Sequence, residues 1–276
     1  IVTAKSIHGN SPEEIRLALE QSLSDDFTPT LAIVFISIKQ DRKAVSTMLD
    51  KMGIDVIGAT SAGEFTDGHQ SEGASVIMLL DIPKEEYSIF FFFFCDGSSE
   101  VTARQLGEVA LRQFNHPAII FCSTFLSAEG IAIDGETLMR NIENVVGSQV
   151  NIFGGMAGDD LSFTGSYVFT NNDATDYGLV ALIVDADKIA MQGMAISGWK
   201  PMGISRTITK SEGNLIYTID DKPALETYMR FLGGDLSTAD DNFNFFDSIG
   251  VHYPFQIERE NREPMMCNPI GYDREK

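Results

Sequence analysis

Two short segments of this 276-residue chain place acids directly after small residues, a combination suited to binding a charged small molecule. The first runs from Ile57 to Phe65 (IGATSAGEF) and the second from Ile152 to Asp160 (IFGGMAGDD). Small residues let a ligand approach backbone N–H groups, and glycine permits the positive φ angles of anion-binding turns. The N–H groups and nearby hydroxyls would hold a carboxylate, while the acids would hold an ammonium. This chemistry favours an amino acid or a similar small zwitterion.

The candidate ligand-binding residues come mainly from these two segments. Ser123 is added because it ends the apolar run PAIIFCS, and strand ends in open α/β sheets often face ligands. Trp199, the single tryptophan, is added because it could form the wall of a pocket. The predicted set is Thr60, Ser61, Gly63, Glu64, Ser123, Gly155, Met156, Asp159, Asp160 and Trp199. The alternative is that each segment is a tight, close-packed turn between strands.

Catalysis is weakly supported by the residue patterns, and we predict that the chain is not an enzyme. Ser61 in ATSAG approximates the nucleophile elbow of hydrolases. That motif requires a helix directly after the nucleophile, but the composition of the segment that follows Ser61 does not favour one, because it is rich in glycine and polar residues. Cys122 would need a base and an electropositive setting that nothing in the sequence supplies. A hydrolase using Ser61 or Cys122 is the alternative.

No metal and no cofactor are predicted. The four histidines, His8, His69, His116 and His252, form no metal-binding spacing, and each is expected to be structural. Axial ligation of haem needs only one histidine in an apolar pocket. A haem-based gas sensor that uses His8 or His252 is therefore the second alternative.

Composition restricts the partners and the compartment. The formal net charge of −20 and the pI of about 4.4 would repel phosphate backbones and anionic lipid, which argues against nucleic acid as a partner. The three cysteines are far apart, so they predict neither a disulfide framework nor a zinc site and fit a reducing compartment. The longest apolar runs are too short to span a membrane, and the start shows no signal-peptide pattern. We predict a cytoplasmic chain without membrane insertion.

The elements that would position the two loops follow one another in the same order twice. The first half predicts strands at 2–9, 30–38 and 54–59, helices at 11–23 and 41–53, and a hairpin of strands 73–81 and 86–95. The second half predicts helices at 98–114 and 134–147, and strands at 117–124, 150–155, 165–170, 177–187 and 188–199. Ser11 and Pro12 mark the start of the first helix, where Glu14 completes a capping box. The run IFFFFF is expected in the core, on both faces of a sheet.

The repeated order predicts an α/β fold built from two duplicated half-domains, with mixed sheets, flanking helices and a pseudo-twofold axis. The halves would span residues 1–95 and 96–204, and the axis would bring the two loops to one cleft. Residues 205–276 differ in pattern and predict a partial second domain, with a helix beginning at Pro223.

Several of these segments, in this order, resemble the FIST sensory domain family, named for F-box and intracellular signal transduction proteins. The similar segments are GATSAGEF, FGGMAGDD, YGLVALIV followed by GMAISGWKPMG, and ITKSEGNLIYTIDDKPALETY. Together they span most of residues 25–232. We expect residues 1–204 to form the family's N-terminal domain, and GVHYPFQIERENREPMMCNPIGYD resembles the start of its C-terminal domain. DDKPA departs from the Asp-Gly that is usual at that turn.

The resemblance implies a sensory domain for small molecules, with amino acids as the proposed ligands. Domains of the family occur alone or joined to chemoreceptor, kinase or cyclic-dinucleotide signalling modules, which are the partners that it implies. Some relatives are associated with haem and nitric oxide sensing. The resemblance supplies no catalytic residues.

Overall fold

The computed structural model describes residues 2–24, 26–94, 98–194, 198–213, 215–234, 243–259 and 262–273. The chain forms two compact units, residues 1–194 and residues 195–276. The domain boundary expected after residue 204 stays a prediction. Cys95 lies outside the described residues. Within the described part of the chain, no helix is long and apolar enough to cross a membrane.

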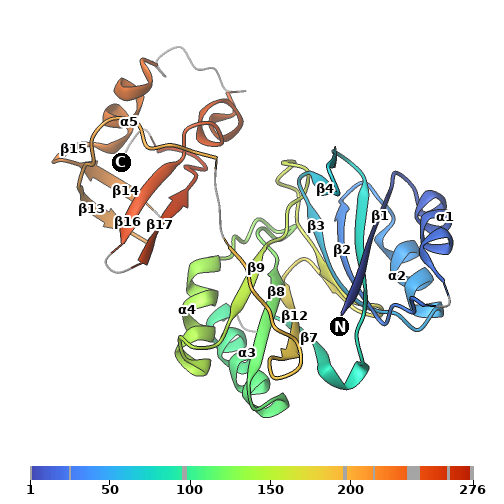
Figure 1. Ribbon diagram of the computed structural model, residues 1–276. Coiled ribbons are helices and arrows are strands. Elements are labelled where there is room, and N and C mark those ends of the chain that lie inside the picture. Colours follow the sequence, from blue (N-terminus) through green and yellow to red (C-terminus); the bar gives the residue numbers. More distant parts are fainter. Residues whose placement is uncertain are drawn as a thin grey trace. The chain divides into compact units, whose positions relative to one another are not determined.

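Two mixed β-sheets form the centre of the first unit (Figure 1). The first sheet has the strand order β1-β6-β2-β3-β10-β11, made of β1 (Thr3–Gly9), β2 (Leu31–Ser37), β3 (Asp55–Ser61), β6 (Ser75–Asp81), β10 (Val168–Phe169) and β11 (Ala174–Thr175). The second sheet has the order β7-β12-β8-β9, made of β7 (Tyr87–Phe93), β8 (Pro117–Ser123), β9 (Ile152–Met156) and β12 (Gly178–Asp185). A small hairpin, β4 (Glu64–Thr66) and β5 (His69–Ser71), follows β3.

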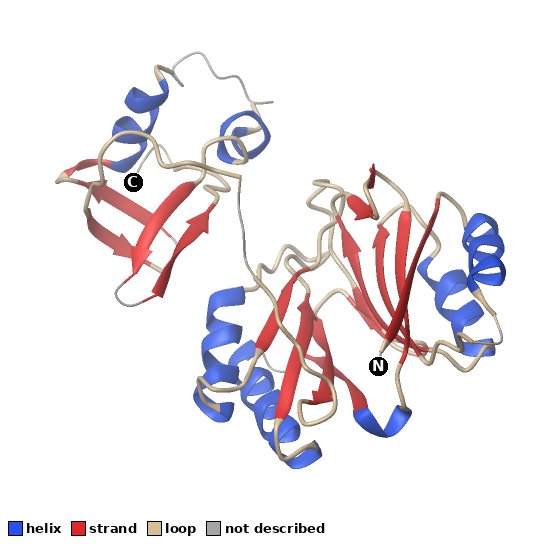
Figure 2. Ribbon diagram, in the orientation of Figure 1, coloured by secondary structure: helices blue, strands red, loops and turns tan. Residues whose placement is uncertain are grey.

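Four helices cover the outer faces of the sheets, while the inner faces pack against each other (Figure 2). Helices α1 (Pro12–Ser22) and α2 (Arg42–Lys51) bury Leu19 and Leu49 against the first sheet. Helices α3 (Ser99–Gln113) and α4 (Gly135–Val146) cover the second sheet. Between the sheets, residues such as Ile57 and Val180 belong to one buried cluster. The result is the α/β architecture with flanking helices that the sequence predicts.

The two sheets share one connectivity. In the first, β1 and β6 are antiparallel, β6 and β2 are antiparallel, and β2 and β3 are parallel. In the second, the pairs β7 and β12, β12 and β8, and β8 and β9 repeat these directions in the same order. The helices also follow the same strands in both halves. This order agrees with a duplication, and superposition of the halves about a twofold axis stays a prediction.

Local capping marks the start of α1, as the sequence predicts. The Ser11 hydroxyl accepts a 3.2 Å hydrogen bond from the Glu14 N–H at the start of α1. The Glu14 carboxylate accepts from the Asn10 N–H at 2.8 Å, one residue before the position expected for a capping box. Asp41 caps α2 in the same way, with a 2.9 Å bond from the Ala44 N–H.

The predicted hairpin of strands 73–81 and 86–95 is wrong, because β6 and β7 belong to different sheets. Strand β6 already has a partner on each side, β1 and β2, so β7 pairs with β12 instead. A 3₁₀ turn at Lys84–Glu86 carries the chain from one sheet to the other, and the Tyr87 hydroxyl donates to the Asp55 carboxylate at 2.7 Å.

The phenylalanine-rich run does contribute to the core on both faces of its sheet. Phe90 and Phe92 pack on the side of α3 and α4, whereas Ile89 and Phe91 pack between the sheets.

The strand predicted at 188–199 is wrong for the described residues 188–194, which contain no strand. Residues 195–197 lie outside the described residues.

The second unit contains two small sheets and one regular α-helix among its described residues. The first sheet is β13 (Ile208–Glu212), β14 (Leu215–Ile219) and β15 (Lys222–Pro223), and the second is β16 (Phe255–Arg259) and β17 (Arg262–Cys267). Helix α5 spans Ala224–Leu232 with Pro223 as its N-cap, next to the predicted start. A π-helical turn covers Phe246–Gly250.

Candidate functional site

The two Ala-Gly-acid loops lie in direct backbone contact in the first unit. The Gly158 N–H donates to the Thr60 carbonyl oxygen at 2.8 Å, and the Asp160 N–H donates to the Ser61 carbonyl oxygen at 3.1 Å. The Thr60 hydroxyl donates in return to the Gly158 carbonyl oxygen at 2.5 Å. The loops therefore converge, as the sequence predicts.

Close packing explains part of the small-residue pattern. A Cβ atom added to Gly158 would lie 2.8 Å from the Ala62 nitrogen, and one added to Gly154 would lie 2.1 Å from the Phe121 carbonyl oxygen. Both neighbours are backbone atoms, so they cannot move aside as a flexible side chain would. At these positions the alternative interpretation, a close-packed turn, accounts for the glycine.

The contact forms where parallel strands end in both sheets. Strands β2 and β3 end side by side at Ser37 and Ser61, and strands β8 and β9 end side by side at Ser123 and Met156. The Ala157 N–H then donates to the Ser123 carbonyl oxygen at 2.7 Å, which fixes the second loop to its sheet. The carboxyl ends of strands are the usual place for ligand sites in α/β sheets.

Glu64 is used within its own loop. Its side chain is only 1% exposed, and the Ser61 hydroxyl donates to one carboxylate oxygen at 2.6 Å. The Ala74 N–H donates to the other oxygen at 3.1 Å. Both oxygens therefore hold the polypeptide that surrounds the loop.

Asp159 also has a structural role, whereas the sequence pattern predicts that it binds an ammonium group. It is 6% exposed, and one carboxylate oxygen accepts from the Thr164 N–H at 2.7 Å and from the Gly165 N–H at 3.1 Å. The loop that it closes has left-handed backbone at Leu161 and Phe163, with φ angles of 59° and 52°. Bonds to the Asp159 carboxylate compensate for part of the cost of such angles in residues other than glycine.

Asp160 has contacts of a different kind. Its Oδ2 accepts a 2.7 Å hydrogen bond from the Ser37 hydroxyl and lies 3.3 Å from the Lys39 Nζ. The Asp160 side chain is 10% exposed, whereas that of Lys39 is 72% exposed. One loop of the second half thus forms an ion pair with the segment after β2 in the first half.

Sequence reasoning missed Ser37 and Lys39. The signal was present in part, since Ser37 ends a buried apolar run and is aligned with Ser61 in the parallel pair. Local sequence pattern does not predict that Asp160, from the other half of the chain, contacts these two residues.

The remaining predicted residues of the first unit differ in accessibility. Thr60 and Ser123 are buried, and the Ser123 hydroxyl has backbone acceptors inside the protein. Met156 packs beside Gly135 at the start of α4, where an added Cβ would lie 2.8 Å from its sulfur. Gly155 is exposed, and an added Cβ there would meet no atom within 4 Å.

Of the two predicted residues that remain, Gly63 lies within the first loop and Trp199 lies outside both loops. Gly63 has a φ angle of 119°, which only glycine adopts readily, so its role in the turn is conformational. Trp199 belongs to the second unit and is half exposed. Its role in a ligand site stays a prediction.

The hydrolase alternative finds little support in the placement of its nucleophiles. Cys122 lies in the buried cluster between the sheets, and burial raises the pKa of its thiol to about 12. A thiol with so high a pKa is protonated at neutral pH and is a poor nucleophile. The Ser61 hydroxyl donates to Glu64, which is itself bonded to the backbone.

The histidines proposed for haem do not fit that role. His8 is exposed, and its ring stacks on that of His69 with 4.4 Å between the ring centroids. His252 is exposed in the second unit. An axial ligand needs a histidine in an apolar pocket, whereas both of these histidines are exposed.

Comparison with known families gives a match that covers the loops just described. A model of the FIST N domain matches residues 30–222, a range that runs from the start of β2 to β15 and includes both loops. No curated protein matches the chain.

Proposed function

The chain belongs to the FIST family of sensory, small-ligand-binding signalling domains, and from this premise we propose that it binds an amino acid or a similar small zwitterion where its two loops meet. The single observation that carries the proposal is the ion pair between Asp160 and Lys39, 3.3 Å long, at the junction of the two loops.

An amino acid carries the same two charges as this ion pair and can replace it. Its ammonium would lie against the Asp160 carboxylate, which the Ser37 hydroxyl already orients. Its carboxylate would take the ammonium of Lys39, whose side chain is largely exposed and free to turn. The ion pair between Asp160 and Lys39 would be replaced by two ion pairs, one from each residue to the ligand. Every charge at the site would then still have a partner of opposite charge, so that burying the ligand's charges costs little free energy.

The buried acids support this arrangement indirectly. Glu64 holds the first loop and Asp159 holds the second, so the loops that carry Ser61 and Asp160 are fixed before a ligand arrives. Such preorganisation lowers the entropy lost on binding. Gly155 adds open space at the end of β9.

A thermal-shift screen tests the proposal, because a ligand that binds only the native state raises its apparent stability. The screen compares each amino acid with its amine, which lacks the carboxylate, and with its acid, which lacks the ammonium. We expect stabilisation by one or a few amino acids and by neither partial analogue. Stabilisation by simple amines or acids as large as that by the amino acid would contradict a site that recognises both charges.

A further inference from the structure

Arg42 is a cation that forms no ion pair within the described part of the chain. It is the first residue of α2, and its guanidinium lies over the Tyr167 ring, with 4.0 Å between the Arg42 Cζ and the ring centroid. The side chain is half-buried, and this burial lowers the pKa of the guanidinium below its ordinary value. A bound anion would compensate a positive charge that has lost part of its hydration.

Tyr167 connects Arg42 to the junction of the two loops. The Thr60 N–H donates to the Tyr167 carbonyl oxygen at 2.8 Å, and the Tyr167 N–H donates to the Thr60 hydroxyl oxygen at 2.8 Å. Thr60 is also the residue whose carbonyl oxygen binds the Gly158 N–H. Arg42 follows Lys39 by three residues, in the segment where β2 passes into α2. The guanidinium and the ion pair of Lys39 therefore lie at the same end of the first sheet.

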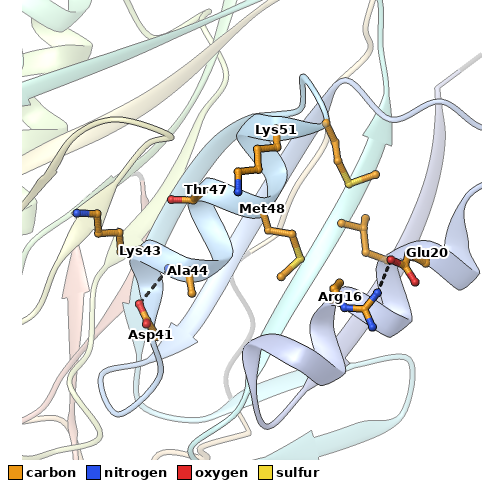
Figure 3. Close-up of a pocket in the computed structure, with 10 residues that line it drawn as sticks. Arg16, Glu20, Asp41, Lys43, Ala44, Thr47, Met48 and Lys51 are labelled. Atoms are coloured by element: carbon orange, nitrogen blue, oxygen red, sulfur yellow. Dashed lines mark hydrogen bonds and ion pairs between the residues drawn. The ribbon is translucent and has the colours of Figure 1, made fainter.

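The acids of this region already have other partners. Asp41 attracts the guanidinium of its neighbour Arg42, but its carboxylate caps α2 through the hydrogen bond that Figure 3 draws as a dashed line. Glu64 and Asp159 hold backbone N–H groups of their own loops. Asp160 forms the ion pair described above. Among the described residues, none of these acids is thus the counter-ion of Arg42.

The position of the guanidinium suits a carboxylate. Stacking on Tyr167 occupies one face of the planar group and leaves the N–H groups at its edge for an acceptor. A carboxylate matches these N–H groups with two parallel hydrogen bonds, which the ammonium of a lysine cannot form. The ring also holds the guanidinium in one plane, so less conformational entropy is lost when a carboxylate binds.

The charges at the junction indicate which charges the ligand carries. Lys39 and Arg42 contribute two positive charges and Asp160 contributes one negative charge, so the complementary molecule has two carboxylates and one ammonium. We propose that the ligand is an acidic amino acid, in the class of aspartate and glutamate, and that Arg42 binds its side-chain carboxylate. This assignment rests on the proposed function, in which Asp160 takes the ammonium and Lys39 takes the α-carboxylate.

The test is titration calorimetry of the whole chain with glutamate against glutamine, and with aspartate against asparagine. The members of each pair differ only in the side-chain group, a carboxylate in one and a neutral amide in the other. We expect one acid to bind at least about tenfold more tightly than its amide, because only the carboxylate forms charged hydrogen bonds to the guanidinium. The net charge of −20 repels an acidic ligand, so general electrostatics would produce the opposite preference.

Variants of the chain assign the preference to Arg42. Arg42→Gln should lower the affinity for the preferred acid at least about tenfold and leave the affinity for its amide unchanged, which shows at the same time that the site is folded. Arg112→Gln is the matched control, because Arg112 is exposed in the last turn of α3, near the start of β8, whereas the loops lie at the end of that strand. This variant should bind the acid and the amide as the wild type does. Should Arg42→Gln not fold, Arg42→Lys takes its place and should reduce the preference, because an ammonium lacks the fork of N–H groups.

Failure of this assignment and failure of the proposed function give different results. Amides that bind as tightly as their acids, or binding of uncharged amino acids alone, would refute the acidic ligand and leave a site for amino acids. A preference that survives in Arg42→Gln, or that falls equally in Arg112→Gln, would contradict the role of Arg42. Loss of both the acid and the amide in Arg42→Gln would make its role structural only. If no amino acid binds the wild type, the proposed function fails, and this assignment fails with it.

Discussion

The backbone N–H of Gly158 lies 2.8 Å from the carbonyl oxygen of Thr60, across 98 residues of sequence. This bond and its neighbours make one structural unit of two loops from different halves of the chain. The bond requires close approach of the two backbones, and glycine at position 158 permits that approach. The repeated sequence pattern therefore reflects packing first, and the proposed ligand site is built on the rigid junction that results.

The substitution Gly158→Ala tests the close packing. An added Cβ would lie 2.8 Å from the Ala62 nitrogen and 2.9 Å from the Ser61 carbonyl carbon, so the loops would have to move apart. We expect a loss of about 1–3 kcal/mol in the free energy of unfolding, as for other overpacked sites, measured by urea denaturation. Gly155→Ala is the matched control, because its Cβ would meet no atom within 4 Å. Equal stability of the two variants would show that the loops are not held this tightly.

Asp159→Asn tests the structural role of that acid. The carboxylate is buried and accepts two backbone N–H bonds, and an amide presents a weaker acceptor there and adds a buried donor. We expect a loss of about 1–3 kcal/mol in unfolding free energy. The exposed Asp50→Asn in α2 should change stability by less than about 0.5 kcal/mol. If Asp159→Asn were as stable as Asp50→Asn, the carboxylate would be available for a ligand after all.

His116 and Asp187 form an exposed pair whose pH dependence can be measured directly. The Nδ1 of His116 lies 2.9 Å from the Asp187 carboxylate, and this hydrogen bond raises the pKa of the imidazole above its ordinary value. A raised folded-state pKa stabilises the protein below the unfolded pKa, and this contribution is lost as pH rises through the folded value.

NMR titration of the His116 ring should therefore give a higher pKa in the wild type than in Asp187→Asn. The variant should lose stability at pH 5 and lose little at pH 8. An unchanged His116 pKa in Asp187→Asn would exclude the pairing in solution.

Cys122 provides a test of the prediction that the chain has no turnover. Burial raises its pKa to about 12, so at pH 8 the thiol is protonated as well as inaccessible. We expect slow alkylation of Cys122 in the native protein and fast alkylation after unfolding, followed by mass spectrometry of the peptides. Cys267 is half-buried and should react sooner. Rapid native alkylation of Cys122 that abolished a hydrolytic activity would restore the enzyme alternative.

Sequence alone predicted the features whose causes are local. Ser11 caps its helix through a bond from a residue three positions away, so the signal lies within one turn. The buried strand ending at Ser37 was recognisable because its side chains are almost continuously apolar. The FIST resemblance rests on such local segments, and the family match supports it.

The failures arise where distant segments decide the structure. Strands β6 and β7 are neighbours in sequence, but β6 pairs with β1 and β7 pairs with β12, which are distant in sequence. A hairpin prediction from local pattern does not include such distant partners. Likewise, Asp159 and Asp160 are adjacent in the sequence. The Asp159 carboxylate faces its own loop, whereas the Asp160 carboxylate reaches Ser37, and Asp160 has left-handed backbone with a φ angle of 54°.

Titration calorimetry of the amino acid found by the screen, against wild type, Asp160→Asn, Lys39→Gln and Asp50→Asn, tests the central claim most directly. The account predicts that removing either charge of the ion pair weakens binding by about 1.5–3 kcal/mol, or roughly 10- to 150-fold, because each variant loses a charged hydrogen bond to the ligand. Asp50→Asn should bind as the wild type does. Wild-type affinity in both Asp160→Asn and Lys39→Gln would contradict the account and leave the paired loops as a structural junction.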